Sequence, residues 1–500
     1  MRFALCLGPC EEESALLVRR MLAALPGAAS GSARVYSFAS GALGVLARDG
    51  RDSELSHRVL AGDSRVTIAA CDPICVAEPV RTVLERAHRS DNAANEFTSL
   101  DGSFVAVQVD ARSGRHVVVT DFIGMAPAFQ ARREGALLIS TTPSALLVDT
   151  AVSEDPDPAG WGALLGFGNA IGNTTKLAAV RRLPSAAVLE FDSAGALLGE
   201  RRYWSWPHES GDRRFGAGDV VELLGGSVAA YRREYTADTV LLSGGFDSRI
   251  IAGLLQRRGD TPRGLIQRHP DENANADGRF GVLAARSMGL PYEVHDVSRD
   301  FFSSHDYLAY LHEADVDVQS FYLFIATTAR LLNPSRGAVW LDTVVGSLVK
   351  RNAVADSPED YARRIMQSDQ LEARLSSLQL FTREWRAAMH AGARESLAAE
   401  MAGIPATRQG SRELRNRTRV RTRIGAHFHR VHSGRVPVAT PGLDRNSWSL
   451  SMGVSLEAAT ARELLHQLLR AYMPAAARVP FASGTRLSRV LPVAAPQLLL

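Results

Sequence analysis

The residues best suited to chemistry form one short run, Ser243-Gly244-Gly245-Phe246-Asp247-Ser248. Its two adjacent glycines let the backbone approach a ligand without hindrance from Cβ atoms. If the run opens a helix, its backbone N–H groups and the helix dipole attract an anion such as a phosphate. Ser243 and Ser248 add hydroxyl donors, and Asp247 is suited to hold Mg²⁺ against a pyrophosphate. The run is neither a Walker A loop nor the dinucleotide-binding G-x-G-x-x-G pattern.

The flanking sequence predicts the elements that position this run. Strands and helices are expected to alternate, at 239–242, 248–258, 264–267, 277–288 and 292–294. Such alternation indicates a parallel sheet covered by helices, so the fold class is α/β. From about residue 355 onward the pattern is mostly helical.

The first half of the chain reads as mixed strand and helix. Apolar residues at helical spacing predict a helix at 12–25, which ends at Pro26-Gly27. Short aliphatic runs predict strands at 115–120 and 136–140. Between 203 and 218 a tryptophan-bearing segment gives way to a polar, glycine-bearing one. We therefore expect two domains, 1–207 and 216–500.

The hexad after a strand resembles the S-G-G-x-D-S pyrophosphate loop of the ATP-pyrophosphatase (PP-loop) superfamily, which implies ATP as cosubstrate. Within that superfamily the chain is similar to asparagine synthetases. Asp277, Gly281, Ala285 and Gly289 match that group's D-x3-small-x3-A-x3-G helix. The segments 434–437 and 441–444 resemble its R-x-P-F-L-D stretch, so the resemblance covers nearly the whole chain in matching order.

Asp342, within 338–347, stands where the group has its second aspartate loop, G-x-D-E-x-F-G-G. The resemblance implies that Asp247 and Asp342 are Mg²⁺ ligands and catalytic residues. The usual glycines and glutamate of this loop are absent, which leaves its substrate side undefined. The resemblance also implies ATP contacts from Leu242, Ser243, Gly244, Gly245, Phe246, Asp247, Ser248 and Ile266.

The N-terminal half resembles the family's class II amidotransferase domain, an Ntn-hydrolase-like αββα fold, at 100–105 and 121–127. In working glutaminases of this class a cysteine follows the initiator methionine, whereas this chain has Arg2. The N-G-E-I-Y-N glutamine-holding loop is also missing, with 70–75 in its place. Cys6 acts as nucleophile only if a leader is removed. We therefore expect a degenerate domain without a catalytic cysteine.

β-Lactam synthetases and lasso-peptide macrolactam synthetases share this loss. Both adenylate a carboxylate that an amine of the same molecule then attacks, so neither needs a separate ammonia supply. The C-terminal loop at 478–484 lacks the lysine of β-lactam synthetases. Arg478 can neutralise phosphate charge there, but its pKa prevents it from moving a proton. Arg249 replaces the serine common in asparagine synthetases, and this pattern favours a lasso-peptide cyclase.

Other candidates rest on weaker patterns. Glu372 lies about as far beyond Asp342 as the catalytic glutamate of β-lactam synthetases lies beyond its second aspartate. The arginine-rich stretch 412–435 contacts ATP phosphates or an acidic peptide, or it is a solvated face. His427, His429 and His432 are close in sequence, but packing or surface roles are favoured over a metal site.

Composition narrows the partners. The 500 residues carry a net charge of +3 and no apolar run of membrane-spanning length, so we expect a cytoplasmic protein without a nucleic-acid or membrane partner. The four cysteines form no disulfide framework and lack zinc spacing, which indicates buried thiols.

The expected activity is an AMP- and pyrophosphate-forming ligation that uses ATP and Mg²⁺. The preferred substrate is a precursor peptide, whose N-terminal amine is joined to an internal Asp or Glu side chain, with a leader-binding or leader-peptidase protein as partner. Alternatives are a β-lactam synthetase-like or ammonia-dependent ligase acting on a small molecule. A non-catalytic scaffold is an alternative of another class.

Overall fold

The structure is a computed structural model, and it divides the chain into two compact units. It describes residues 1–8, 10–208, 216–269, 275–314, 327–328, 331–332, 336–341, 345, 355–368, 381–425, 429, 431–432, 434–452 and 461–481. The first unit comprises Met1–Glu209, Leu311–Phe321 and Ala353–Arg435; the second comprises Ser210–Tyr310, Tyr322–Asn352 and Val436–Leu500. The first unit thus contains residues from both predicted domains, 1–207 and 216–500. The boundaries of these domains stay a prediction.

The first unit contains two antiparallel sheets of six strands each. The first sheet has the order β10 (Val180–Arg182), β8 (Phe129–Arg133), β9 (Ala136–Ser140), β1 (Arg2–Leu7), β3 (Gly41–Leu46) and β2 (Ala33–Phe38). The second has the order β12 (Leu197–Arg202), β11 (Ala187–Phe191), β7 (Arg115–Thr120), β6 (Asp101–Asp110), β5 (Arg65–Ile74) and β4 (Val59–Ala61).

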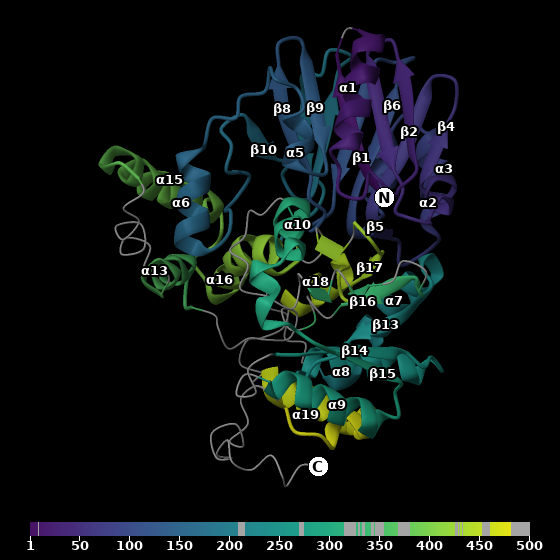
Figure 1. The fold of residues 1–500 in the computed structure, drawn as a ribbon, viewed down its shortest axis with the longest axis vertical. Coiled ribbons are helices and arrows are strands. Elements are labelled where there is room, and N and C mark those ends of the chain that lie inside the picture. The colour runs from purple at the N-terminus through teal and green to yellow at the C-terminus, as the bar shows by residue number, and fades with distance from the viewer. Residues whose placement is uncertain are drawn as a thin grey trace. The chain divides into compact units, whose positions relative to one another are not determined.

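Side-chain alternation along the strands stacks these sheets between helices. In β1, Phe3 and Leu5 join a core shared with the second sheet, whereas Ala4 and Cys6 face α1 (Glu11–Ala23). Figure 1 shows α1 along the outer face of the sheet that contains β1. The second sheet packs its outer face against two helices, α3 (Val80–Arg89) and α4 (Ala93–Phe97). The result is the expected four-layer αββα arrangement. Two short helices complete it, α2 (Ser53–Arg58) and α5 (Pro143–Leu146).

Helices from 158 onward form a further core in the first unit. They are α6 (Pro158–Phe167), α13 (Pro358–Ser368), α15 (Arg383–Met401), α16 (Arg408–Arg415) and a π-helix at Asn416–Gly425. Glycines allow α6 and α15 to approach closely, because a Cβ on Gly162 would lie 2.0 Å from the Met389 carbonyl oxygen. The prediction that the chain is mostly helical after residue 355 is confirmed for the described residues.

The second unit is built on one parallel sheet. Its order is β15 (Tyr292–Asp296), β14 (Arg263–Arg268), β13 (Ala237–Leu241), β16 (Ala338–Trp340) and β17 (Val438–Ala439). The chain adds strands outward from β13 in one direction and then, from β16, in the other. In such sheets the crevice at the carboxyl ends of the two adjacent strands where the strand order reverses is the usual ligand site. Here those strands are β13 and β16.

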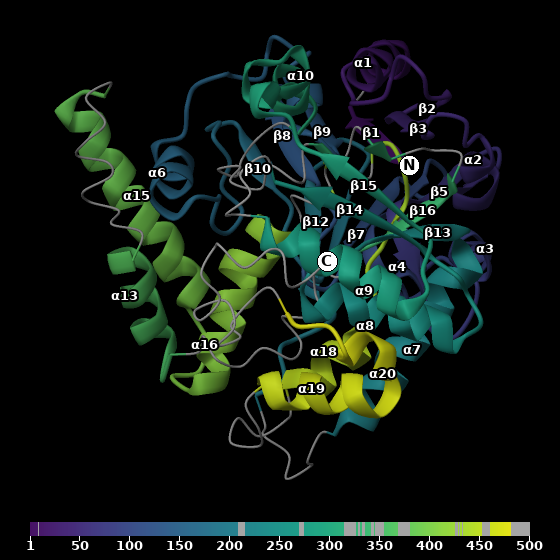
Figure 2. The ribbon, with the colours of Figure 1, turned by 60° about the horizontal axis from the view of Figure 1, so that its bottom comes forward.

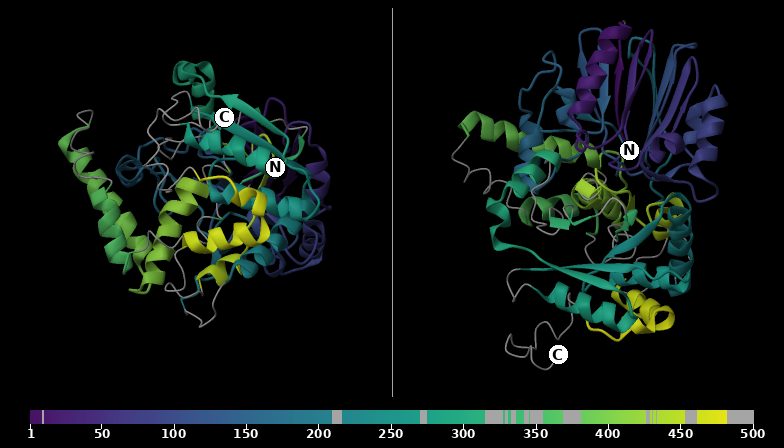
Figure 3. Two further views of the ribbon diagram at one scale, coloured as in Figure 1. Left: turned by 90° about the horizontal axis from the view of Figure 1, so that it is seen from below. Right: turned by 45° about the vertical axis from the view of Figure 1, so that its right-hand side comes forward.

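Helices cover this sheet in two tiers. α8 (Phe246–Arg257) packs on β13, and α9 (Ala276–Met288) packs on β14 and β15. α19 (Ala461–Tyr472) contacts α7 (Ala217–Glu234) and α8, while α20 (Pro474–Ala477) contacts α8 and α9. Figure 2 and the right-hand view of Figure 3 show the yellow C-terminal helices beside the teal helices. The remaining elements are a 3₁₀ helix at Arg299–Ser303, α10 (His305–Ala314) and α18 (Arg445–Met452).

Candidate functional site

The glycine loop lies where the sequence predicts it, between β13 and α8. The Leu242 N–H donates to the Leu265 carbonyl at 3.0 Å and so extends the parallel ladder one residue past the end of β13. Leu242 itself is buried. The chain then turns, and α8 begins at Phe246 with Gly245 in the extended conformation before it. The strand–loop–helix arrangement therefore presents the loop at the carboxyl end of a central strand.

Two serine hydroxyls hold the loop in one shape. Ser248 Oγ accepts from the Ser243 N–H and pairs with Ser243 Oγ, both at 3.1 Å. Ser243 Oγ in turn accepts from the Gly245 N–H at 3.1 Å. A Cβ on Gly245 would lie only 3.2 Å from that oxygen, so glycine suits the turn. Both serines therefore shape the loop itself, a role that the sequence did not separate from direct phosphate contact.

Two charged side chains hold Gly244 through the two peptide groups on either side of it. Its N–H donates to the Asp277 carboxylate, and its carbonyl accepts from Arg249 Nη2 at 3.1 Å. The Asp277 side chain as a whole is solvent-exposed. Burial of its carboxyl group raises the pKa of Asp277, whereas Arg249 and the Gly244 N–H favour the charged form and partly oppose this shift. This explains the aspartate at the start of the predicted D-x3-small-x3-A-x3-G helix.

The start of α8 fits an anionic ligand. Among the described residues no side chain caps this helix. Its first-turn N–H groups and the positive end of its dipole therefore face the space beside Gly245, where an anion can bind. Asp247 lies in that turn and is partly buried. A carboxylate beside an anion-binding helix end is suited to hold Mg²⁺ between itself and phosphate oxygens. The residues at this position therefore fit a magnesium-bound polyphosphate.

α9 approaches the loop closely because Gly281 has no side chain. A Cβ there would lie 3.2 Å from Ile266 Cγ2 and 3.3 Å from the Leu242 carbonyl oxygen. Ile266 is fully buried in β14 beneath this contact. Of the predicted ATP-contacting residues, Leu242 to Ser248 form one continuous stretch from the end of β13 into the first turn of α8, and Ile266 packs in the core beside it.

Two candidate residues fall outside the described part of the chain. β16 ends at Trp340, and Leu341 donates its N–H to the Ala439 carbonyl of β17 at 2.8 Å. Asp342, the next residue, and Glu372 lie outside the described residues, so their roles stay predictions. β17 lies between the segments 434–437 and 441–444, which resemble the R-x-P-F-L-D stretch of asparagine synthetases, and it pairs in parallel with β16.

The C-terminal segment 476–481 is joined to the glycine loop through Arg249. This fully buried guanidinium donates to the carbonyls of Ala476 (3.3 Å), Val479 (2.7 Å) and Pro480 (2.7 Å). Phe481 stacks on Phe246, the first residue of α8, with ring centroids 3.7 Å apart. The sequence singled out Arg249 only as a departure from the family and gave no signal for Phe481. The candidate Arg478 is exposed within this segment.

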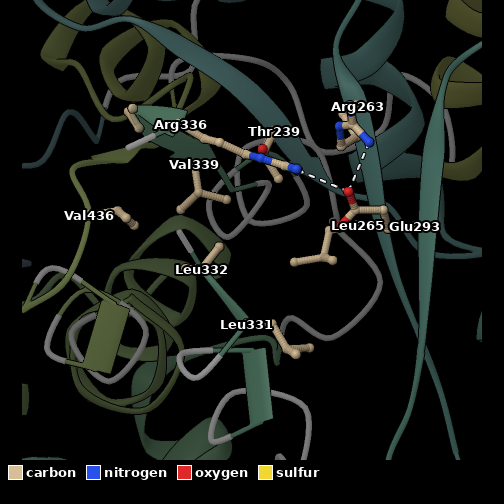
Figure 4. A pocket seen from close by; sticks show the side chains of 11 residues that line it. Thr239, Arg263, Leu265, Glu293, Leu331, Leu332, Arg336, Val339 and Val436 are labelled. Carbon is tan, nitrogen blue, oxygen red and sulfur yellow. Dashed lines mark hydrogen bonds and ion pairs between the residues drawn. The ribbon is translucent and has the colours of Figure 1, made fainter. Parts of the chain in front are cut away.

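A cavity lies near the amino ends of the strands of the same sheet, away from the glycine loop. Figure 4 shows Arg336 and Arg263 reaching the Glu293 carboxylate from different sides, at 3.0 and 2.8 Å. Leu265, Leu331, Leu332, Val339 and Val436 supply apolar lining. Its volume of about 170 Å³ is below the roughly 300 Å³ at which small-molecule pockets begin. It therefore does not compete with the glycine loop as a nucleotide site.

Two cysteines of the first unit, Cys6 and Cys71, lack the surroundings of reactive thiols. Cys6 is buried in β1 against Ser14, and burial raises its pKa. Burial also raises the pKa of Cys71 to about 12. Cys75 is buried and Cys10 is exposed, and all four are free thiols. A nucleophilic cysteine needs a stabilised thiolate, which raised pKa values disfavour.

The arginine-rich stretch is partly internal. Arg421 is buried in the π-helix and donates to the Leu183 carbonyl (3.1 Å) and Asn173 Oδ1 (3.3 Å) of the same unit. His429 is buried, which lowers its pKa to about 4 and keeps it neutral at pH 7. His432 is also buried, and His427 lies outside the described residues. In the described part of the chain, no three His, Cys, Asp or Glu side chains gather as metal ligands.

Comparison with known proteins adds little to this geometry. No protein-family model and no curated protein sequence matches the chain. Among solved structures it is similar to the allosteric regulatory enzyme of purine biosynthesis, with 12% identity and a TM-score of 0.29 over 59% of this chain. That similarity spans 65% of the other chain, just under two thirds of its length.

A second similar structure is the glutamine phosphoribosylpyrophosphate amidotransferase from B. subtilis in complex with ADP and GMP. The identity is 11% and the TM-score 0.29, over 74% of this chain and 79% of that one. A TM-score of 0.29 is too low to establish a shared fold. Separately, no helix within the described residues is both long and apolar enough to cross a membrane.

Proposed function

We propose that this chain is an ATP-dependent amide synthetase that activates a carboxylate as its acyl-adenylate. The observation that carries the proposal is the glycine loop, held by Ser243 and Ser248 at the start of an uncapped helix. It stands at the carboxyl end of β13, the central strand of a parallel sheet and one of the two strands where the strand order reverses. An anionic polyphosphate is the ligand that such a position attracts.

The reaction divides into two steps with balanced atoms. A carboxylate oxygen attacks the α-phosphorus of ATP, the α–β phosphoanhydride bond breaks, and pyrophosphate leaves. An amine nitrogen then attacks the acyl carbon, loses a proton and expels AMP. The loop and first turn of α8 bind the phosphates and orient the α-phosphorus. Asp247, with Asp342 as its predicted partner, would hold Mg²⁺, which neutralises phosphate charge.

The amine does not come from glutamine in this proposal. Cys6 and Cys71 are buried thiols with raised pKa values, which makes them poor nucleophiles for glutamine hydrolysis. An amine carried by the substrate itself satisfies the reaction without a glutaminase, and it gains the advantage of proximity. Proximity of the amine to the activated carboxyl group favours ring closure over transfer of free ammonia.

The substrate we propose is a precursor peptide, whose N-terminal amine is joined to the side-chain carboxylate of an internal Asp or Glu. This product is the macrolactam ring of a lasso peptide, and a leader-binding or leader-cleaving protein is the proposed partner. A cytoplasmic location accords with these substrates. A β-lactam synthetase-like or ammonia-dependent ligase is the second candidate, favoured if a small molecule rather than a peptide is consumed.

Pyrophosphate release with candidate peptides, ATP and Mg²⁺ tests the activity. Asp247→Ala should abolish release, whereas Asp300→Ala, which removes an exposed carboxylate in the same unit, should leave it unchanged. Mass spectrometry separates the substrates: loss of one water from the peptide supports the macrolactam, and a primary amide formed from ammonia refutes it. No release with any carboxylate, together with no nucleotide binding, would leave the scaffold alternative.

A further inference from the structure

The Arg249 guanidinium links two parts of the second unit that are far apart in sequence. It donates to the Gly244 carbonyl in the glycine loop and to three carbonyls between Ala476 and Pro480. Its Cζ atom also lies 4.4 Å from the centre of the Phe481 ring. A planar fork with five donors suits this task, since one side chain satisfies several acceptors in fixed directions.

The charge of Arg249 makes these contacts specific. The side chain is fully buried, and burial lowers its pKa to about 10, so it remains charged at neutral pH. A buried cation is costly unless polar groups surround it. The carbonyl groups that accept from Arg249 supply that polar environment. Two of them, the carbonyls of Ala476 and Val479, lie at the C-terminal end of α20, where a positive charge is favoured. Arg249 and the segment 476–481 therefore depend on each other.

Aromatic contacts reinforce the link. Phe481 stacks on Phe246 at the start of α8, and His466 of α19 meets both rings edge-on, at 5.3 and 4.8 Å. The segment thus touches the loop at Gly244 through Arg249 and at Phe246 through Phe481. Arg478 is exposed between these two attachments.

We propose that Arg249 is a positioning residue, which seats the segment 476–481 on the glycine loop and thereby places Arg478 at the reaction site. The proposal rests on the proposed function of that loop. One side chain then sets two features together: the orientation of the Gly244 carbonyl and the location of Arg478, the only cation of the segment. Substitution of Arg249 should disturb both.

Limited trypsin digestion tests the seating without nucleotide or substrate. Cleavage after Arg478 reports release of the segment, and cleavage after Arg470 in α19 serves as the internal reference. Arg249→Met should raise the relative rate at Arg478 by about tenfold or more, because several hydrogen bonds to a charged group are lost. Phe481→Leu, which leaves Arg249 intact, should raise it in the same direction.

Arg257→Met is the matched control. Arg257 lies on the same helix and contacts the Tyr472 ring at 5.3 Å, but it is exposed and does not contact the segment. Its substitution should leave cleavage at Arg478 unchanged. Equal cleavage at Arg478 in wild type, Arg249→Met and Phe481→Leu would overturn the seating, whatever the activity of the chain.

Kinetics of pyrophosphate formation test the positioning. Arg249→Met should lower kcat, and adding Arg478→Met should then reduce kcat by less than about twofold further, because the arginine is already misplaced. Arg249→Lys keeps the charge but loses the planar fork, so it should rescue kcat only in part. Multiplicative losses in the double variant would overturn the positioning role even if the segment is released.

Discussion

The Ser248 hydroxyl offers a direct test of how the glycine loop is shaped. Ser248 is buried in α8 and accepts the Ser243 N–H, while the Ser243 hydroxyl accepts the Gly245 N–H. Ser248→Ala removes the acceptor of the Ser243 N–H and leaves the rest of α8 intact. The loop then loses the contact that favours its present conformation over alternatives.

The expected cost follows from the lost acceptor. A buried donor left without a partner costs about 1–3 kcal/mol. Ser243 is only partly buried, so water can replace the hydroxyl to some extent and the lower range, about 1–2 kcal/mol, applies. If the substitution raises the free energy of the loop conformation that binds nucleotide by this amount, nucleotide affinity drops by about 5- to 30-fold.

Isothermal titration with a non-hydrolysable ATP analogue and Mg²⁺ measures this change. Thr120→Val is the matched control: its hydroxyl accepts the Ala187 N–H at 3.1 Å in the first unit, so it should lower stability and leave affinity unchanged. If Ser248→Ala binds the analogue within about twofold of wild type, the hydroxyl chain does not hold the binding-competent loop and the reasoning is wrong.

Three further predictions concern stability, measured by chemical denaturation. Gly162→Ala should destabilise the first unit by about 1–3 kcal/mol, because its Cβ meets the Met389 carbonyl at 2.0 Å, whereas Gly226→Ala, in open space on α7, should stabilise by about 0.5–1 kcal/mol. Burial lowers the pKa of His116 to about 4, so the folded state binds fewer protons than the unfolded state between pH 4 and 6.5. The free energy of unfolding should therefore decrease as the pH falls below 6.5, by about 2 kcal/mol between pH 7 and pH 5. His116→Leu should remove this pH dependence. Glu293→Gln leaves Arg263 and Arg336 without their shared carboxylate; since all three are more than a third exposed, the cost should stay below about 1 kcal/mol and shrink in high salt.

Local residue patterns were enough to place several elements in both units. The strands predicted at 115–120 and 136–140 match β7 and β9 to the residue, because β-branched and aliphatic runs there end at turn residues. The predicted helices at 248–258 and 277–288 begin and end within about two residues of α8 and α9. These elements depend mainly on local residue patterns, which can be recognised in a single sequence.

Features that depend on distant partners were not predictable. Arg421 and Arg249 are buried against backbone carbonyls such as those of Leu183 and Val479, and a carbonyl is present at every residue, so no residue type marks the acceptor. Helix pairing through glycine is similar: Gly162 shows its role only when Met389 is known to lie beside it. The order of the parallel strands likewise follows from tertiary packing rather than from any one strand.

The predicted chemistry places a specific demand on the C-terminal segment. Arg478 is the only cation in 476–481, and arginine stays protonated throughout the working pH range, so it can neutralise charge on the leaving AMP but cannot accept the proton that the attacking amine loses. The amine must therefore arrive uncharged or pass its proton to another group. Arg478→Lys separates these roles, because a lysine amine titrates within a pH range that an assay can reach, whereas a guanidinium does not. If the charge at this position acts electrostatically, the rate of Arg478→Lys should fall as the pH rises through the lysine pKa; a rate that rises through that pKa would instead show that the amine accepts a proton.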